Sequence, residues 1–142
     1  TRFLLNLNQA VDTVFKAIEE ANPGETYVPN ASSATIFNIA KALIGKRQID
    51  IEISGIRPGE KMHEIMVSSE EAFRCVSRGR YYAIKPMLPE LNGQTEKEPR
   101  VLSKEFSSYD NPLSLEDTAR LLKKNRLRVK DVVSLAGEEL LR

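Results

Sequence analysis

One short stretch of the sequence, Arg57-Pro58-Gly59-Glu60-Lys61, combines charged residues with a predicted turn. Pro58-Gly59 is a turn dipeptide, because proline presets φ and glycine accepts a positive φ. The turn should hold Arg57, Glu60 and Lys61 close together. A guanidinium group offers a planar fork of donors for phosphate oxygens, and a nearby carboxylate can accept hydrogen bonds from vicinal hydroxyl groups. These residue types suit the diphosphate and ribose of a nucleotide, whereas a surface turn with a local ion pair is the plainer interpretation.

Lys61 and His63 are possible further site residues. Lys61 has two interpretations, contact with a phosphate or an ion pair with Glu64. His63 is the only histidine of the sequence, and a lone histidine can serve as a general base near neutral pH. We nevertheless expect a structural or hydrogen-bonding role for His63, and we predict no catalytic residue in this chain.

The composition excludes several classes of function. The 142 residues carry 21 basic and 20 acidic side chains, so the net charge of +1 gives no sign of nucleic-acid binding. With a single cysteine and a single histidine, a Cys/His zinc site is excluded. Cys75 is expected to be a buried structural thiol on a helix. No apolar run reaches the roughly 18–20 residues of a membrane span, and no signal peptide is visible, so a cytoplasmic protein is expected.

The elements that must position the turn are short strands and amphipathic helices. Helices are predicted over 7–21, 35–43, 68–76, from 114 onward and over 130–141, from apolar spacings of three and four residues and from capping residues. Strands are predicted over 3–5, 26–28, 49–53 and 81–84, and the strict alternation of Ile49-Asp50-Ile51-Glu52-Ile53 leads directly into the turn. Residues 85–112 are predicted to form a long surface loop. The mixture indicates an α/β fold, or α+β when the chain is isolated.

The run Arg57-Pro58-Gly59-Glu60-Lys61-Met62-His63-Glu64 resembles the Arg-Pro-Gly-Glu-Lys-x-His-Glu signature of UDP-N-acetylglucosamine 4,6-dehydratases and related epimerases. These enzymes are extended short-chain dehydrogenase/reductase proteins of polysaccharide and flagellin-sugar biosynthesis. The opening Thr1-Arg2-Phe3 and the segments 24–29, 81–84 and 106–112 resemble further family segments. The resemblance covers roughly residues 1–125, the expected sugar-nucleotide-binding domain, and leaves 126–142 as a helical extension.

The resemblance implies roles for three residues. Arg57 and Arg2 correspond to arginines that contact the UDP diphosphate, and Glu60 corresponds to the acidic residue that contacts the ribose. It also implies an NAD(P)-dependent parent enzyme, a UDP-sugar 4,6-dehydratase or epimerase. The chain starts with Thr1 inside an apolar segment, as expected for the carboxy-terminal part of such an enzyme. The expected partners are therefore a UDP-sugar, an amino-terminal Rossmann domain and further copies of the enzyme in a homo-oligomer.

The sequence lacks the motifs that would make this chain a complete catalyst. It has no G-x-G-x-x-G fingerprint, so no cofactor is expected to bind to this chain alone. Tyr81 and Lys85 spell the Tyr-x-x-x-Lys pair of the superfamily, but their segment is predicted to be a strand. We interpret that match as a coincidence.

Two other functions remain open. An interaction or oligomerisation module would use the late helical segment with Leu121-Leu122-Lys123-Lys124, and it would leave Arg57 exposed outside any cleft. A regulatory domain would bind a UDP-sugar without acting on it. Whether the parent is a dehydratase or an epimerase, and which sugar it uses, does not follow from the sequence.

Overall fold

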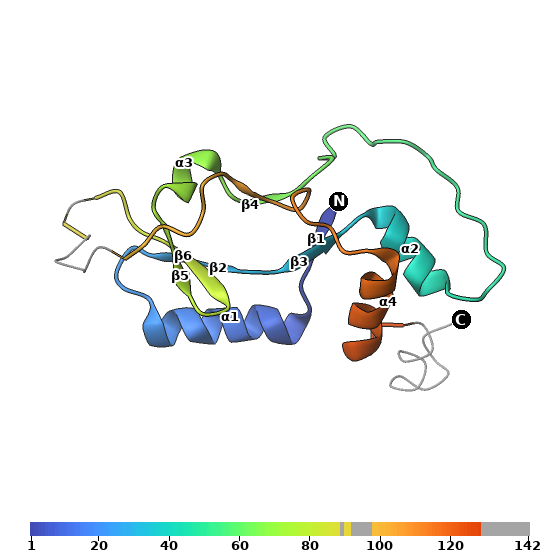
Figure 1. Ribbon diagram of the computed structural model, residues 1–142, viewed down its shortest axis with the longest axis horizontal. Helices are drawn as coiled ribbons and strands as arrows, with labels where there is room; N and C mark the ends of the chain where they lie inside the picture. Colours follow the sequence, from blue (N-terminus) through green and yellow to red (C-terminus); the bar gives the residue numbers. More distant parts are fainter. Residues whose placement is uncertain (89, 92–97, 129–142) are drawn as a thin grey trace.

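The computed structural model of the protein describes residues 1–88, 90–91 and 98–128. Short strands and helices alternate along the chain and form an elongated molecule (Figure 1). The order of the elements is β1 (Arg2–Leu4), α1 (Leu7–Glu20), β2 (Thr26–Pro29), β3 (Ser32–Ala34), α2 (Ile36–Ile44), β4 (Ile65–Val67), α3 (Ser69–Ala72), β5 (Cys75–Arg78), β6 (Tyr81–Ile84), β7 (Phe106–Ser107) and α4 (Leu115–Lys124).

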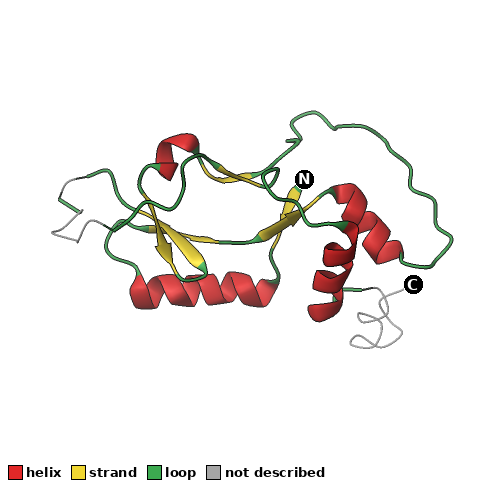
Figure 2. Cartoon of the chain, viewed as in Figure 1, coloured by secondary structure: helices red, strands yellow, loops and turns green. Residues whose placement is uncertain are grey.

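The described strands form three small antiparallel sheets (Figure 2). The largest has the order β2-β6-β5, and the two-stranded sheets pair β1 with β3 and β4 with β7. Helix α1 lies along the three-stranded sheet, while α2 and α4 pack together at the other end of the molecule (Figure 1). This arrangement confirms the predicted mixture of helices and short strands.

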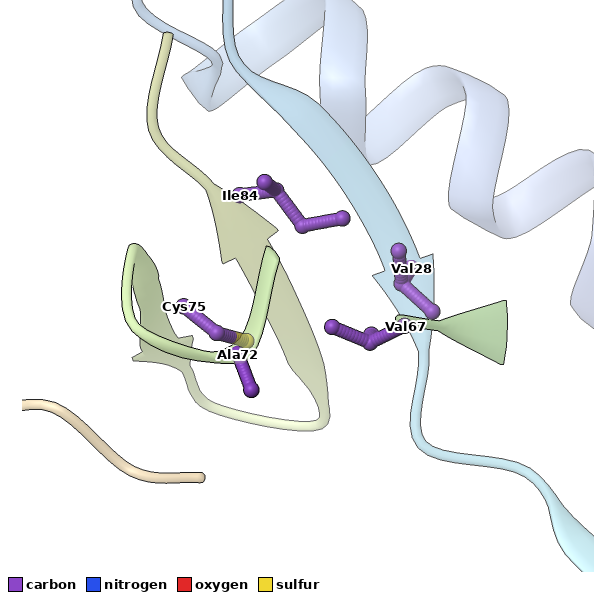
Figure 3. Packing of buried hydrophobic residues seen from close by; sticks show 5 residues of the cluster. All are labelled: Val28, Val67, Ala72, Cys75 and Ile84. Atoms are coloured by element: carbon purple, nitrogen blue, oxygen red, sulfur yellow. The ribbon is translucent and has the colours of Figure 1, made fainter. Parts of the chain in front are cut away.

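A small apolar core lies between the three-stranded sheet, β4 and α3 (Figure 3). Its buried members are Val28, Val67, Ala72, Cys75 and Ile84. Burial, together with the nearby Glu71, raises the pKa of the Cys75 thiol. Cys75 is therefore the inert, buried thiol that its residue type suggested.

Side-chain caps begin the helices where the sequence predicted them. Asn6 caps α1 and Ser68 caps α3, each in a reciprocal capping box with the residue three positions later. Thr35 and Ser114 cap α2 and α4. At α4 the box is only half formed, because Asp117 accepts from the Ser114 hydroxyl group instead of its backbone N–H.

The strand predicted over residues 49–53 is wrong. Residues 45–64 form a long loop from α2 to β4, and the side chains of Ile49, Ile51 and Ile53 are exposed (Figure 1). Alternation makes a strand only where a neighbouring strand supplies hydrogen bonds and a surface to cover the apolar face. The described part of the chain offers residues 49–53 neither.

The helix predicted over residues 68–76 is too long. Helix α3 ends at Ala72, and Cys75 lies on β5, not on a helix. Strands β5 and β6 form a hairpin in which Arg78 faces Tyr81 across the two-residue loop Gly79-Arg80. Gly79 has a φ of 64°, which suits the first position of such a loop. Tertiary pairing with β6 thus overrides the local helical pattern.

Among its described residues, the segment predicted as a loop over 85–112 contains the short strand β7, which pairs with β4. The helix predicted over 130–141, and with it most of the extension 126–142, lies outside the described residues. No helix within the described ranges is long and apolar enough to span a membrane.

Candidate anion-binding site

The predicted turn is present in the loop that precedes β4. The backbone N–H of Glu60 donates to the carbonyl oxygen of Arg57 at 3.1 Å, which closes a four-residue turn. Gly59 has a φ of 80°, so the turn has proline second and a left-handed glycine third, as in a type II turn. The Glu60 carboxylate also accepts from the backbone N–H of Arg57 at 3.3 Å. The turn therefore fixes the Glu60 side chain.

Glu60 connects this turn to the first strand. Its carboxylate lies 3.1 Å from the guanidinium group of Arg2 on β1. The Arg2 guanidinium group also lies 3.5 Å from the Glu64 carboxylate and donates to the carbonyl oxygens of Thr1 and Met62. The Arg2 side chain is 25% exposed, so solvent still reaches this cation. Two carboxylates thus occupy positions around Arg2 that the oxygens of a bound phosphate group could take.

The structure brings Arg2 and Glu60 into direct contact and places the backbone of Arg57 beside them. The Arg57 guanidinium group has no hydrogen bond or ion pair with any described residue, and Arg57 and Lys61 are both exposed. Glu64 pairs with Arg2, so the alternative ion pair of Lys61 with Glu64 is not formed among the residues with described positions. Arg57 and Lys61 are thus cations that no described acid neutralises.

His63 joins the same assembly as a hydrogen-bonding residue. Its Nδ1 atom lies 2.8 Å from the Thr1 hydroxyl group, and its ring lies against that of Tyr109, with centroids 4.6 Å apart. The Thr1 hydroxyl group also lies 2.7 Å from the hydroxyl group of Ser108. These contacts support the structural role expected for His63.

Sequence reasoning missed Thr1, Glu64 and Ser108, which complete this assembly. Glu64 stood in the recognised run, but its pairing with Arg2 depends on the loop returning to β1. Ser108 is fully buried and belongs to a Ser-Ser dipeptide in the predicted loop. Its burial depends on the pairing of β7 with β4, which local sequence does not reveal.

The apparent Tyr-x-x-x-Lys pair does not form a catalytic pair. Tyr81 begins strand β6, and Lys85 directly follows its end. At about 3.3 Å per residue, four steps along an extended chain separate the two backbones by roughly 13 Å, whereas a helix would place them one turn apart. Lys85 instead forms an ion pair with Glu98 at 2.8 Å. These residues do not fit the nicotinamide-ribose site that this motif serves in the superfamily.

Comparison with known proteins establishes the family. Residues 1–86 match the family of polysaccharide biosynthesis proteins. The match spans more than half of the 142 residues, and the chain belongs to this family. This result confirms the resemblance seen in the Arg-Pro-Gly-Glu-Lys run and in the opening strand, both of which lie inside the matched region.

Individual relatives match most of the chain. A UDP-N-acetylglucosamine 4,6-dehydratase (inverting) from Campylobacter jejuni is 34% identical over 122 residues, which cover 80% of this chain and 36% of the relative. A UDP-glucose 4-epimerase from Rickettsia bellii is 36% identical over 129 residues, or 86% of this chain and 38% of the relative.

A solved structure agrees with these relatives. The X-ray structure of Pen from Bacillus thuringiensis superimposes with a TM-score of 0.74 at 25% identity, covering 89% of this chain and 38% of that one. The present chain therefore spans little more than a third of the length of the proteins it matches.

Proposed function

We propose that this chain binds the UDP moiety of a UDP-sugar, such as UDP-N-acetylglucosamine, as the substrate-binding part of a 4,6-dehydratase or epimerase. Arg2 and Arg57 are assigned to the diphosphate and Glu60 to the ribose hydroxyl groups. Lys61 is an additional cation for the phosphates, and His63 supports the site structurally. The observation that carries this proposal is the contact between Arg2 and Glu60, which joins the opening strand to the Arg-Pro-Gly-Glu-Lys turn.

Charge exchange explains how an anion enters this site. Without a ligand, Glu60 and Glu64 neutralise Arg2 at 3.1 and 3.5 Å. A diphosphate supplies stronger, bidentate acceptors for a guanidinium group. On binding it displaces a carboxylate from Arg2, and Glu60 becomes available to the ribose. Arg57 needs no such exchange, because no described residue pairs with its guanidinium group.

The chain contributes binding, and the reaction itself is assigned to a longer polypeptide. NAD(P), the expected cofactor of such an enzyme, supplies hydride transfer when it is bound there. Anchoring the diphosphate fixes the attached sugar near the reacting groups, so binding energy remote from the sugar assists the reaction. The curated names of the relatives include both dehydratases and epimerases, and both remain within the proposal.

An exposed apolar stripe on α1 supports the proposal of a larger protein. Leu7, Val11, Val14 and Ile18 follow helical spacing on one face, and the side chains of Leu7 and Ile18 are 79% and 76% exposed. Such a stripe in a soluble helix normally packs against another layer. We assign its cover to the amino-terminal Rossmann domain of the parent enzyme, consistent with relatives that are more than twice as long.

The interaction module based on residues 121–124 receives less support. Leu122 is buried and Leu121 is partly buried, so these leucines belong to the interior side of α4, not to a free surface. The exposure of Arg57 agrees with that module as well as with an open anion site. A direct binding measurement separates the two.

The test is calorimetric titration of UDP and of uridine. It uses the 142-residue chain and also an enzyme reconstituted by joining the chain to the amino-terminal part of the Campylobacter jejuni relative. The proposal expects UDP to bind more tightly than uridine in both, and more tightly in the reconstituted enzyme. Equal, negligible binding of UDP and uridine in both proteins would refute it.

A further inference from the structure

We propose that Ser108 is a positioning residue that sets the geometry of the anion site through Thr1 and His63. This inference rests on the proposed function for its ligand, but its structural part can be tested without one. Ser108 itself is fully buried and does not contact the expected ligand.

Ser108 joins the segments that carry the site residues. Its backbone N–H donates to the carbonyl oxygen of Glu64 at 2.8 Å, and its hydroxyl oxygen accepts from the backbone N–H of Glu64 at 2.9 Å. The hydroxyl group also lies 2.7 Å from that of Thr1. Its carbonyl oxygen accepts from the hydroxyl group of Ser33 at 2.7 Å. One buried residue thus joins the end of the turn-bearing loop, the residue that precedes β1, and β3.

The directions of these hydrogen bonds follow from a count of protons. The Ser108 hydroxyl oxygen already accepts from Glu64, so its proton is available to the Thr1 oxygen. Thr1 then donates to Nδ1 of His63, whose proton must lie on Nε2. In the reverse order, His63 donates to Thr1 and Thr1 to Ser108. The proton of the buried Ser108 hydroxyl group would then lack a partner among the described residues, which is unfavourable. If Thr1 instead accepted from both Ser108 and His63, its own hydroxyl proton would lack a described acceptor. We therefore assign the order from Ser108 through Thr1 to His63, because it alone gives both hydroxyl protons an acceptor among the described residues.

This chain of bonds determines where Arg2 and Glu60 meet. Arg2 follows Thr1 directly, while Glu60 and His63 belong to the same loop. The Thr1 nitrogen also donates to the carbonyl oxygen of Met62 at 2.8 Å, so Thr1 and the loop are tied at two points. Loss of the Ser108 hydroxyl group removes the bond to Thr1 and the acceptor for Glu64. The Arg2 and Glu60 side chains then lose their fixed separation.

The first test reads the tautomer of His63 by ¹⁵N NMR of the imidazole ring in the full 142-residue chain. His63 is the only histidine, so its ring signals need no assignment. We expect the Nε2–H tautomer in the native sequence and a mixture of tautomers in Ser108→Ala. Ser107→Ala is the matched control, because Ser107 is a buried neighbour whose hydroxyl oxygen accepts only from the backbone N–H of Tyr109 in the described contacts. An Nδ1–H tautomer in the native chain, or an unchanged tautomer in Ser108→Ala, would overturn the inference.

The second test compares UDP with uridine in the reconstituted enzyme. Ser108→Ala should lower the preference for UDP over uridine about tenfold, because displaced cations bind the diphosphate less well, while Ser107→Ala should preserve it. Thr1→Val removes the hydroxyl group that links Ser108 to His63 and leaves Ser108 in place. If Ser108→Ala does not fold, the UDP preference of Thr1→Val provides the test. A native preference for UDP that survives Thr1→Val and Ser108→Ala contradicts the positioning role. If the native enzyme shows no preference for UDP over uridine, the proposed function is contradicted instead. The positioning role of Ser108 is then tested only by the tautomer of His63.

Discussion

The guanidinium group of Arg2 lies 3.1 Å from the carboxylate of Glu60, although 58 positions separate the two residues in the chain. Two segments to which the family resemblance assigned contacts with UDP therefore meet in space. Glu64 adds a second acid beside the same cation at 3.5 Å. The site is thus held in a neutralised state that an incoming diphosphate must disrupt.

Removal of the Glu64 charge should strengthen the binding of UDP. Glu64 competes with the diphosphate for Arg2 and repels it, and a unit charge at about 4 Å is worth about 1 kcal/mol in water. Glu64→Gln should therefore raise UDP affinity about fivefold in calorimetric titration, while uridine affinity stays the same. Glu116→Gln, at an exposed position of α4, is the control and should change neither. Weaker UDP binding in Glu64→Gln would show that Glu64 is not a competitor.

A side chain at position 59 should destabilise the turn through its backbone alone. Gly59 has a φ of 80°, and a Cβ atom there would meet no atom within 4 Å. Gly59→Ala should lower the free energy of unfolding by about 1 kcal/mol, the cost of a left-handed conformation for alanine. Gly59→Asn should cost less, because asparagine tolerates this region. Urea unfolding measures both, and equal effects of the two substitutions would argue against the left-handed turn.

Acid should weaken the ion-pair group around Glu98. Arg78, and secondarily Lys85, lower the pKa of Glu98, so the folded state favours its ionised form. Its contribution to stability is present above the ordinary pKa of 4.5 and is lost as the pH falls through the lower pKa of the folded state.

Glu98→Gln should therefore make the free energy of unfolding less dependent on pH below about 4.5. Thermal unfolding from about pH 2 to about pH 7 provides the measurement, because this range brackets the region below the ordinary pKa of 4.5 in which the contribution is lost. Glu116→Gln is again the control, since the Glu116 side chain is 88% exposed. An unchanged pH dependence in Glu98→Gln would contradict the assigned role of these ion pairs.

Substitution of an exposed and of a buried apolar residue should have different effects on the stability of the chain. Ile18 on α1 is exposed, so Ile18→Ser should leave the stability of the 142-residue chain nearly unchanged while reducing self-association. Leu122 on α4 is 6% exposed, so Leu122→Ala should lower the free energy of unfolding by about 2–5 kcal/mol.

In the reconstituted enzyme, Ile18→Ser should become destabilising if the Rossmann domain covers α1. Urea unfolding of the isolated and reconstituted proteins compares the two states. If Ile18→Ser leaves the stability of both proteins unchanged, the Rossmann domain does not cover the apolar stripe of α1. If the isolated chain forms a dimer that Ile18→Ser abolishes, a second copy of the chain covers the stripe instead.

Local signals in the sequence predicted the helices and the turn well. The helices capped by Asn6, Thr35 and Ser114 begin within one residue of their predicted starts, because capping depends on bonds within four residues. The Pro58-Gly59 turn also formed as predicted. Such features need no distant partner.

Features that depend on distant partners were predicted poorly. Alternation at 49–53 resembled a strand, yet no described strand pairs with it. Residues 73–76 carried a helical pattern, yet Cys75 and Val76 pair with β6. Ser108 lies in the segment 106–112 that resembles the family, but the resemblance gave it no role, because its role arises only when Thr1 and the turn-bearing loop meet around it. For the same reason the sequence suggested Arg2, Arg57 and Glu60 as site residues but not Glu64 or the hydroxyl groups of Thr1 and Ser108.

Substitution of Arg57 tests the central claim most directly, because its guanidinium group has no described structural partner to confuse the result. In the reconstituted enzyme, Arg57→Ala should weaken UDP binding about 10–100-fold, the loss expected for charge-assisted hydrogen bonds worth about 1.5–3 kcal/mol. Uridine binding and the melting temperature should stay unchanged. In the control Arg120→Ala, whose native side chain is 70% exposed on α4, UDP binding, uridine binding and the melting temperature should all stay unchanged. If Arg57→Ala binds UDP as tightly as the native enzyme does, Arg57 does not contact the diphosphate, and the proposed site is wrong.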